Sequence, residues 1–200
     1  MRPGFRPEFS AQECERFAHA GQAVALLAGV LETIAGQKFP VTEVLNGGAV
    51  PFGIAFAAGL YLAQYDRMGR FGGWAFAVHF LSFGYFAGIA FTMNFVLVHL
   101  DPAAVDHLLD GPARWAFLAT AALTLLGTWL FSAALWHARV VPPFAVGCYV
   151  AGLTALSLTF LLPAPIVRVG HVFVGAGMIW LAAWLRAAAG RAAAPLPQYS

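Results

Sequence analysis

The stretch 114–138, RWAFLATAALTLLGTWLFSAALWHA, decides the fold, because no charged side chain interrupts it between Arg114 and His137. A helix needs about 20 mostly apolar residues to cross the hydrocarbon core of a bilayer. This stretch is long enough, and Pro112 precedes it at a position where a missing N–H costs little. We therefore predict a transmembrane α-helix here.

Similar apolar stretches lie on both sides of it, so we predict an all-α integral membrane bundle of six transmembrane helices. The predicted spans are 18–36, 49–65, 72–99, 114–138, 141–162 and 165–187. Pro51 and the pair Pro142-Pro143 are expected to open the second and fifth spans, as Pro112 opens the fourth. The third span is long enough to need a tilt or to project beyond the hydrocarbon.

The composition agrees with a membrane protein. Sixty per cent of the 200 residues are apolar and 10% are charged, and the mean hydropathy is +0.74. Soluble domains carry about 25% charged residues. The net charge of +2 and the lack of a Lys/Arg cluster give no indication of nucleic-acid binding.

The distribution of Lys and Arg predicts the orientation. With the N-terminus inside, the inner segments hold eight basic residues: Arg2, Arg6, Arg16, Arg67, Arg70, Arg139, Arg186 and Arg191. The outer loops hold three: Lys38, Arg114 and Arg168. This bias follows the positive-inside rule. We predict an inner-membrane protein with a cytoplasmic tail at 1–17, a transmembrane domain at 18–187 and a disordered cytoplasmic tail at 188–200.

Ionisable side chains inside the predicted spans are candidate functional residues, because a charge in hydrocarbon is costly. Glu32 lies near the outer end of the first span, and His79 lies in the inner half of the third. Glu32 is either a proton or cation site or an interfacial carboxylate paired with Lys38 or Arg168. His79 is either a haem or proton-relay residue or one partner of a helix–helix hydrogen bond.

Other polar side chains accompany His79 along the third span. Ser82 and Tyr85 follow it at spacings of three residues, which predicts a polar strip on one helix face that could line a cavity. Asn94 adds polarity to the outer half of the span. Glu32, His79, Ser82, Tyr85 and Asn94 are therefore the candidates for a substrate or proton path.

The predicted outer loop between the third and fourth spans concentrates histidine and aspartate. The candidate metal ligands are His99, Asp101, Asp106, His107 and Asp110, together with His171 on the same side of the membrane. Imidazole and carboxylate groups suit a divalent metal, although the spacing matches no standard motif. The alternative is a solvated acidic loop in which Asp101 caps a short helix. The identity of any cofactor stays open.

Small residues four apart indicate where helices pack closely, because lipid provides no hydrophobic drive for helix association. The predicted packing pairs and triplets are Gly21/Ala25/Gly29, Gly53/Ala57, Gly84/Gly88 and Gly147/Ala151.

Two stretches are similar to a known kind of protein. Residues 59–73, GLYLAQYDRMGRFGG, contain a helix end, a basic turn and a Gly-x-x-Gly helix start, and 126–143 end in His137-Ala-Arg139-Val-Val-Pro142. Both resemble small multi-pass bacterial membrane proteins with no assigned activity. The resemblance implies a six-span bundle and no particular chemistry.

Catalytic signatures such as GxSxG, HExxH or a phosphate-binding glycine loop are not found in the sequence. The sequence therefore favours a non-catalytic membrane bundle that acts as a binding, sensing or accessory subunit. Its partner would be another membrane protein or a second copy of the chain. Two alternatives stay open: a channel or transporter for a small solute or proton, and a haem- or metal-binding redox protein.

Overall fold

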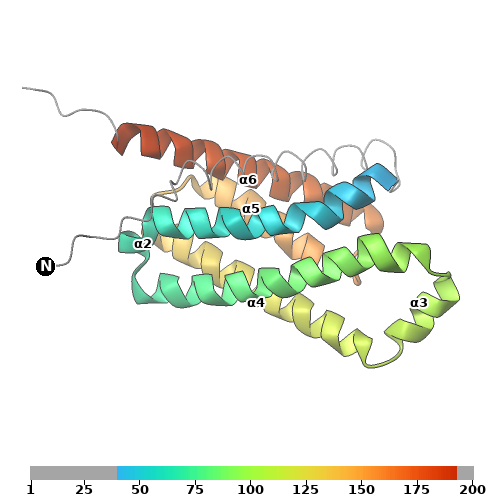
Figure 1. Cartoon of the computed structure of the whole chain (residues 1–200). Coiled ribbons are helices and arrows are strands. Elements are labelled where there is room, and N and C mark those ends of the chain that lie inside the picture. The colour runs from blue at the N-terminus through green and yellow to red at the C-terminus, as the bar shows by residue number, and fades with distance from the viewer. Residues whose placement is uncertain (1–39, 193–200) are drawn as a thin grey trace, which may run out of the picture.

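The computed structural model describes residues 40–192, and this part of the chain is all-α (Figure 1). The elements are α2 (Pro40–Phe91), the π-helix η1 (Thr92–Val96), the 3₁₀-helix η2 (Leu97–His99), α3 (Pro102–Leu109), α4 (Ala113–Ala138), α5 (Pro143–Ser157) and α6 (Ala164–Ala192). The predicted span 18–36, with Glu32 and the triplet Gly21/Ala25/Gly29, lies outside the described residues.

Three segments are long and apolar enough to cross a membrane: Pro40–His99, Ala113–Ala138 and Ala164–Ala187. The helix Pro143–Ser157 is apolar but shorter. For the described residues, the prediction of an all-α protein with helices long and apolar enough to cross a membrane is confirmed. The number of six spans and the orientation stay predictions.

The first of these segments reverses direction at Gly69. Gly69 has φ 58° and ψ −162°, which is a non-helical conformation inside the continuous α2 assignment. Figure 1 shows the two arms of α2 lying antiparallel on either side of this turn. A Cβ placed on Gly53 of the first arm would lie 2.9 Å from the Phe83 ring of the second arm. The reversal falls within the basic turn that the sequence predicts between the second and third spans.

The start of the first arm differs from the prediction. The helix already includes Pro40, so Pro51 lies inside α2 and does not open it. A proline inside a helix lacks one backbone hydrogen bond and crowds the carbonyl four residues earlier. That earlier residue is Gly47. Membrane helices tolerate such a proline where neighbouring helices satisfy the freed backbone groups.

The other helix ends follow local signals. Pro102 and Pro143 each occupy a first helical position, and Arg139 ends α4 in a left-handed conformation with φ 51°. The predicted span 114–138 therefore matches α4 closely. Helix α5 is shorter than the predicted 141–162, because the chain turns after Ser157. Helix α6 continues to Ala192, past the predicted end at 187.

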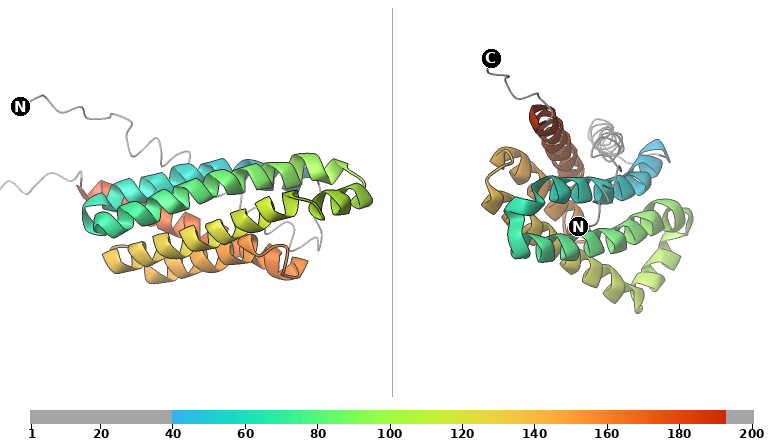
Figure 2. Two further views of the ribbon diagram at one scale, coloured as in Figure 1. Left: turned by 90° about the horizontal axis from the view of Figure 1, so that it is seen from below. Right: turned by 60° about the vertical axis from the view of Figure 1, so that its left-hand side comes forward.

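The long helices form a bundle along one common axis, with α3 lying across one end (Figure 2). Helix α4 packs against α2 and α5, and α6 packs mainly against α5. Aromatic and aliphatic side chains from these helices fill the core, among them Phe56, Leu60, Phe131, Leu135 and Leu181, each at most 1% exposed. These five residues lie in the half of the bundle that is nearer the Gly69 turn.

Close contacts between helices occur at glycines, but only some of these glycines are the predicted ones. Gly53 and the buried Ala57 do face a neighbouring helix. Nothing among the described residues lies within 4 Å of a Cβ placed on Gly84, Gly88 or Gly147. The predicted pairs at those positions are therefore not packing faces in this part of the chain.

The contacts are made by glycines that the four-residue pattern did not single out. A Cβ on Gly127 of α4 would lie 2.8 Å from the His79 Cα atom of α2. Gly152 of α5 lies against the backbone of Val174 in α6, and Gly177 of α6 lies against the backbone of Tyr149 in α5. These glycines let the backbones of α2, α4, α5 and α6 approach one another, as small residues do in membrane bundles.

Candidate functional site

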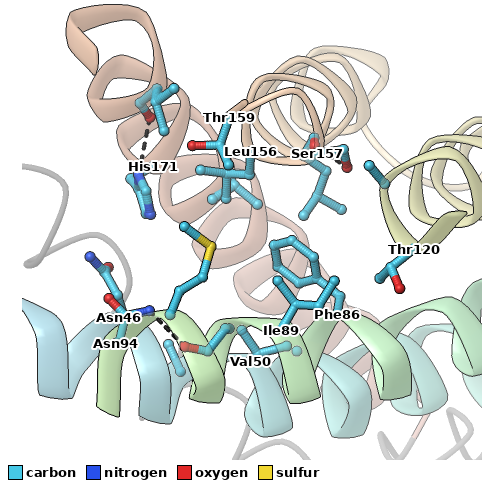
Figure 3. Close-up of a pocket in the computed structure, with 18 of the residues that line it drawn as sticks. Asn46, Val50, Phe86, Ile89, Asn94, Thr120, Leu156, Ser157, Thr159 and His171 are labelled. Atoms are coloured by element: carbon cyan, nitrogen blue, oxygen red, sulfur yellow. Dashed lines mark hydrogen bonds between the residues drawn. The ribbon is translucent and has the colours of Figure 1, made fainter. Parts of the chain in front are cut away.

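The described residues enclose a partly open cavity of about 320 Å³ inside the bundle. Both arms of α2, η1, α4, α5 and α6 contribute to its walls. The walls are mostly apolar, and Figure 3 shows Val50, Phe86, Ile89 and Leu156 along them. Small-molecule sites in proteins are commonly about 300–1,000 Å³ and mostly apolar, so this cavity is the candidate functional site.

A few polar side chains interrupt the apolar wall. Figure 3 shows Asn46, Asn94 and His171 close together on one side of the cavity and Thr120 on the other. Asn46 and Asn94 are each only 8% exposed. Ser157 of α5 also lines the cavity, and its hydroxyl donates to the Leu153 carbonyl at 2.8 Å. The cavity thus has a polar side, which can orient a bound molecule.

The π-helix η1 brings Asn94 to the wall. A π-helical turn interrupts the regular i→i−4 hydrogen-bond ladder, and such turns are frequent at functional sites. Here the side chains of Thr92 and Asn94 donate to the carbonyls of Gly88 and Ala90, each at 2.8 Å. The second bond holds the Asn94 amide nitrogen against its own helix. The predicted candidate Asn94 therefore does line a cavity, although no residue pattern predicts the π turn.

His171 has a defined ring orientation at the same side. Its Nδ1 lies 3.0 Å from the Val167 carbonyl. Because a carbonyl can only accept, Nδ1 carries a hydrogen and donates it. Arg168, one turn earlier on α6, also lines the cavity. The sequence predicts His171 as a metal candidate, and the structure places it in the cavity wall.

His79 lies in the core outside this cavity. It is 0% exposed, and its Nε2 lies 2.7 Å from the hydroxyl of Tyr149 on α5. Its ring stacks on Phe131 at a centroid distance of 4.9 Å and meets the edge of Phe83 at 4.7 Å. Phe83 also lines the cavity, so this ring separates His79 from it. The interhelical hydrogen bond fits the second interpretation of His79.

The predicted strip of His79, Ser82 and Tyr85 is not formed. Ser82 is buried and donates to the His79 carbonyl at 2.7 Å, but Tyr85 is 58% exposed. Successive residues of a helix are about 100° apart, so a residue six positions later lies about 120° away from the first. Three-residue spacing keeps neighbours close but does not hold three residues on one face.

The metal candidates stay apart. His99 ends η2, Asp106 and His107 lie in α3, and Asp101 and Asp110 flank α3. All five are exposed. Within residues 40–192, no three His, Cys, Asp or Glu side chains are grouped so that they could hold a metal ion. Asp101 does occupy the predicted N-cap position of α3, but its side chain makes no capping hydrogen bond.

Several cavity residues were missed from the sequence. Asn46 fell in a predicted loop, because the span was started at 49 and not at Pro40. Thr120 belongs to a row with Thr124 and Thr128 at four-residue spacing, and all three are buried. That spacing on one face of a predicted span was the signal that could have found the polar wall.

Comparison with protein-family models, curated proteins and solved structures gives no match for this chain. The class of the protein therefore follows from its structure alone: it is an all-α protein with three helical segments suited to membrane crossing. The resemblance to six-span bacterial proteins stays a prediction.

Proposed function

We propose that this chain is a non-catalytic, multi-pass membrane protein that binds a small, mostly apolar molecule inside its helical bundle. The observation that carries the proposal is the cavity of about 320 Å³, which has apolar walls and one polar side. The size and the lining are those of small-molecule sites. Binding is also the step that a sensing or an accessory role would require.

The proposed topology has six spans with both termini in the cytoplasm of a bacterial cell. The reversal at Gly69 divides Pro40–His99 into two arms, which supports two separate crossings. Figure 1 shows the start of α2 and the end of α6 at opposite ends of the bundle. A further crossing by 18–36 would bring the N-terminus to the same side as the end of α6.

Charges at the two ends of the bundle support the orientation. One end of the bundle contains the Gly69 turn, the end of α4 and the end of α6. Up to residue 187, its basic residues are Arg67, Arg70, Arg139 and Arg186. Those at the opposite end are Arg114 and Arg168. The first end is the cytoplasmic one under the positive-inside rule. Reporter fusions after Arg70, Asp106 and Arg186 test this, and an externally located reporter at Arg70 would refute it.

Helix α5 is the weakest of the proposed spans. Its 15 residues extend about 22 Å, whereas the hydrocarbon core is about 30 Å thick. Val140, Val141 and Pro142 before the helix, and the mostly apolar stretch 158–162 after it, lengthen the segment on both sides. Its position between α4 and α6 keeps most of its backbone away from lipid, which supports a crossing that is helical only in part.

Transport of the bound molecule is a second candidate function. The observation that favours it is the π-helix η1, because a π turn in a cavity wall provides a place where the helix can change its hydrogen-bond register. Flux of a tritiated ligand into proteoliposomes would distinguish transport from binding. A bound ligand without flux would leave the binding role.

The test of the cavity uses two neighbouring alanines of α4. Ala121 lines the cavity, and Ala122 is exposed on the outer surface of the same helix. Purified wild-type protein in a maltoside detergent is titrated with the apolar fluorophore N-phenyl-1-naphthylamine. Ala121→Trp should weaken saturable binding at least tenfold, because the indole occupies part of the cavity, whereas Ala122→Trp should bind as wild type does. Equal binding by both variants would exclude the cavity as the site.

A further inference from the structure

Arg168 is the charged group of the cavity wall. It lies on α6, is partly buried and precedes His171 by one turn. The described lining of the cavity contains no Asp or Glu. A permanently charged group therefore faces a mostly apolar space without a carboxylate from this part of the chain.

The chemistry of this position suits an anion. Arginine stays protonated and binds carboxylate or phosphate oxygens with two parallel hydrogen bonds. Ala164, the first residue of α6, lines the same side of the cavity. The positive end of a helix dipole there adds to the attraction for a negative charge. A partly buried charge next to apolar groups is also costly unless it is paired.

The remaining space suits a hydrocarbon chain. A cavity of about 320 Å³ holds about ten groups of the size of a water molecule, each occupying about 30 Å³. Its walls also include the apolar side chains of Phe86, Ile89 and Phe117. These side chains offer no hydrogen bond to a tail.

The Arg168 charge and the apolar space share one cavity. We therefore propose that the ligand of this cavity is a single-chain amphiphile with an anionic head, which is a carboxylate or a phosphate. The head binds Arg168 beside His171 and the tail lies between the helices, with head and tail together amounting to roughly ten small groups. This inference rests on the proposed binding function and specifies its ligand class. The same chemistry is offered by a free fatty acid from solution and by a single-chain anionic lipid of the membrane.

The experiment compares decanoate with decanol, which has the same tail and no charge. Each competes with N-phenyl-1-naphthylamine for full-length wild type, Arg168→Gln and Arg114→Gln in a maltoside detergent. Arg114 is the matched control, because it is an exposed arginine at the same end of the bundle and does not line the cavity. We expect Arg168→Gln to bind decanoate at least tenfold more weakly with decanol unchanged, and Arg114→Gln to bind both as wild type does.

The outcomes separate this inference from the binding function. If Arg168→Gln binds the fluorophore and decanoate as wild type does, the anionic head is refuted while the cavity function stands. If wild type binds none of the probes, both the anionic head and the binding function are refuted. Should Arg168→Gln not fold, Arg168→Lys keeps the charge and removes the paired hydrogen bonds, and undiminished decanoate binding by that variant would overturn the role of the guanidinium.

A nanodisc experiment identifies the source of the ligand. Wild type in zwitterionic nanodiscs is loaded with labelled decanoate, and lysophosphatidic acid, which carries a single acyl chain, is then included in the bilayer. Displacement of decanoate supports an anionic membrane lipid as ligand, and retention supports a fatty acid from solution. Wild type that takes up no decanoate in either bilayer would overturn the proposal.

Discussion

The Nε2 atom of His79 and the hydroxyl of Tyr149 lie 2.7 Å apart and join α2 to α5 through two fully buried side chains. A neutral imidazole carries its hydrogen on one nitrogen. If Tyr149 donates to Nε2, the hydrogen lies on Nδ1, which has no partner among the described residues. If Nε2 donates, the phenol hydrogen needs another acceptor. The pair is therefore at least one hydrogen bond short in either arrangement, because Nδ1 has no described partner in both.

Tyr149→Phe should destabilise the protein by about 1–3 kcal/mol. The change removes the bond and leaves both nitrogens of a buried imidazole without partners, and an unsatisfied buried polar group costs about that much. The measurement is the free energy of unfolding in mixed micelles titrated with SDS. Tyr85→Phe is the control, because its 58% exposed side chain should change the free energy by less than about 0.5 kcal/mol.

The double variant His79→Leu/Tyr149→Phe gives a second readout of this pair. Removing both polar groups should cost less than the sum of the single changes, with a coupling of about 0.5–3 kcal/mol. Purely additive effects of the two substitutions would show that the hydrogen bond does not contribute to stability.

Gly127→Ala should separate α4 from α2. The new Cβ atom would lie 2.8 Å from both the His79 Cα atom and the Ser82 Oγ atom, and the first of these is backbone that cannot move without the helix. Overpacking of this kind costs about 1–3 kcal/mol. Gly84→Ala is the control, since no described atom lies within 4 Å of its Cβ position. Thermal unfolding followed by circular dichroism compares the two, and equal melting temperatures would contradict the close contact.

The sequence predicted α4 well and the packing glycines poorly, for different physical reasons. The bounds of α4 follow from hydropathy, because lipid requires a long run without charges, and Pro112 and Arg139 mark its ends. Contacts such as that of Gly127 with His79 depend on the rotation of one helix against another. Small residues four apart also occur where no described atom lies close to them, as Gly84 and Gly88 show, so spacing alone does not identify the face in contact.

The candidate site was predictable only in part. Asn94 adds polarity to the outer half of the predicted third span, and it does line the cavity. The remaining polar wall combines Asn46, Thr120 and Arg168 from three different helices, and their proximity depends on the tertiary arrangement. The π turn of η1 has no sequence signal comparable to the glycine and proline residues at the other turns.

Gly69→Ala should destabilise the hairpin of α2 by about 1–3 kcal/mol. With φ 58° and ψ −162°, Gly69 lies in a region of backbone conformation that is essentially restricted to glycine. Nothing described lies within 4 Å of its Cβ position, so the cost would be one of backbone conformation and not of packing. The free energy of unfolding measures it in mixed micelles.

Gly48→Ala provides the control for this turn. Gly48 is exposed in the helical first arm of α2, and no described atom lies within 4 Å of its Cβ position. Alanine there should be neutral or stabilise the helix by up to about 1 kcal/mol. If Gly69→Ala were as stable as Gly48→Ala, the chain would not reverse through this conformation.

Tryptophan fluorescence tests whether α4 crosses the bilayer. Trp115 lies near the start of α4 and Trp129 near its middle, about 21 Å further along the axis, and both are exposed on the bundle surface. Variants that keep one of the two, with the other tryptophans changed to phenylalanine, are reconstituted in lipids brominated at different depths. If α4 spans, bromine near the bilayer centre should quench Trp129 more strongly than Trp115, and shallow bromine should favour Trp115. Equal quenching of both at every depth would place α4 parallel to the membrane surface, because only a transverse helix separates its tryptophans by depth.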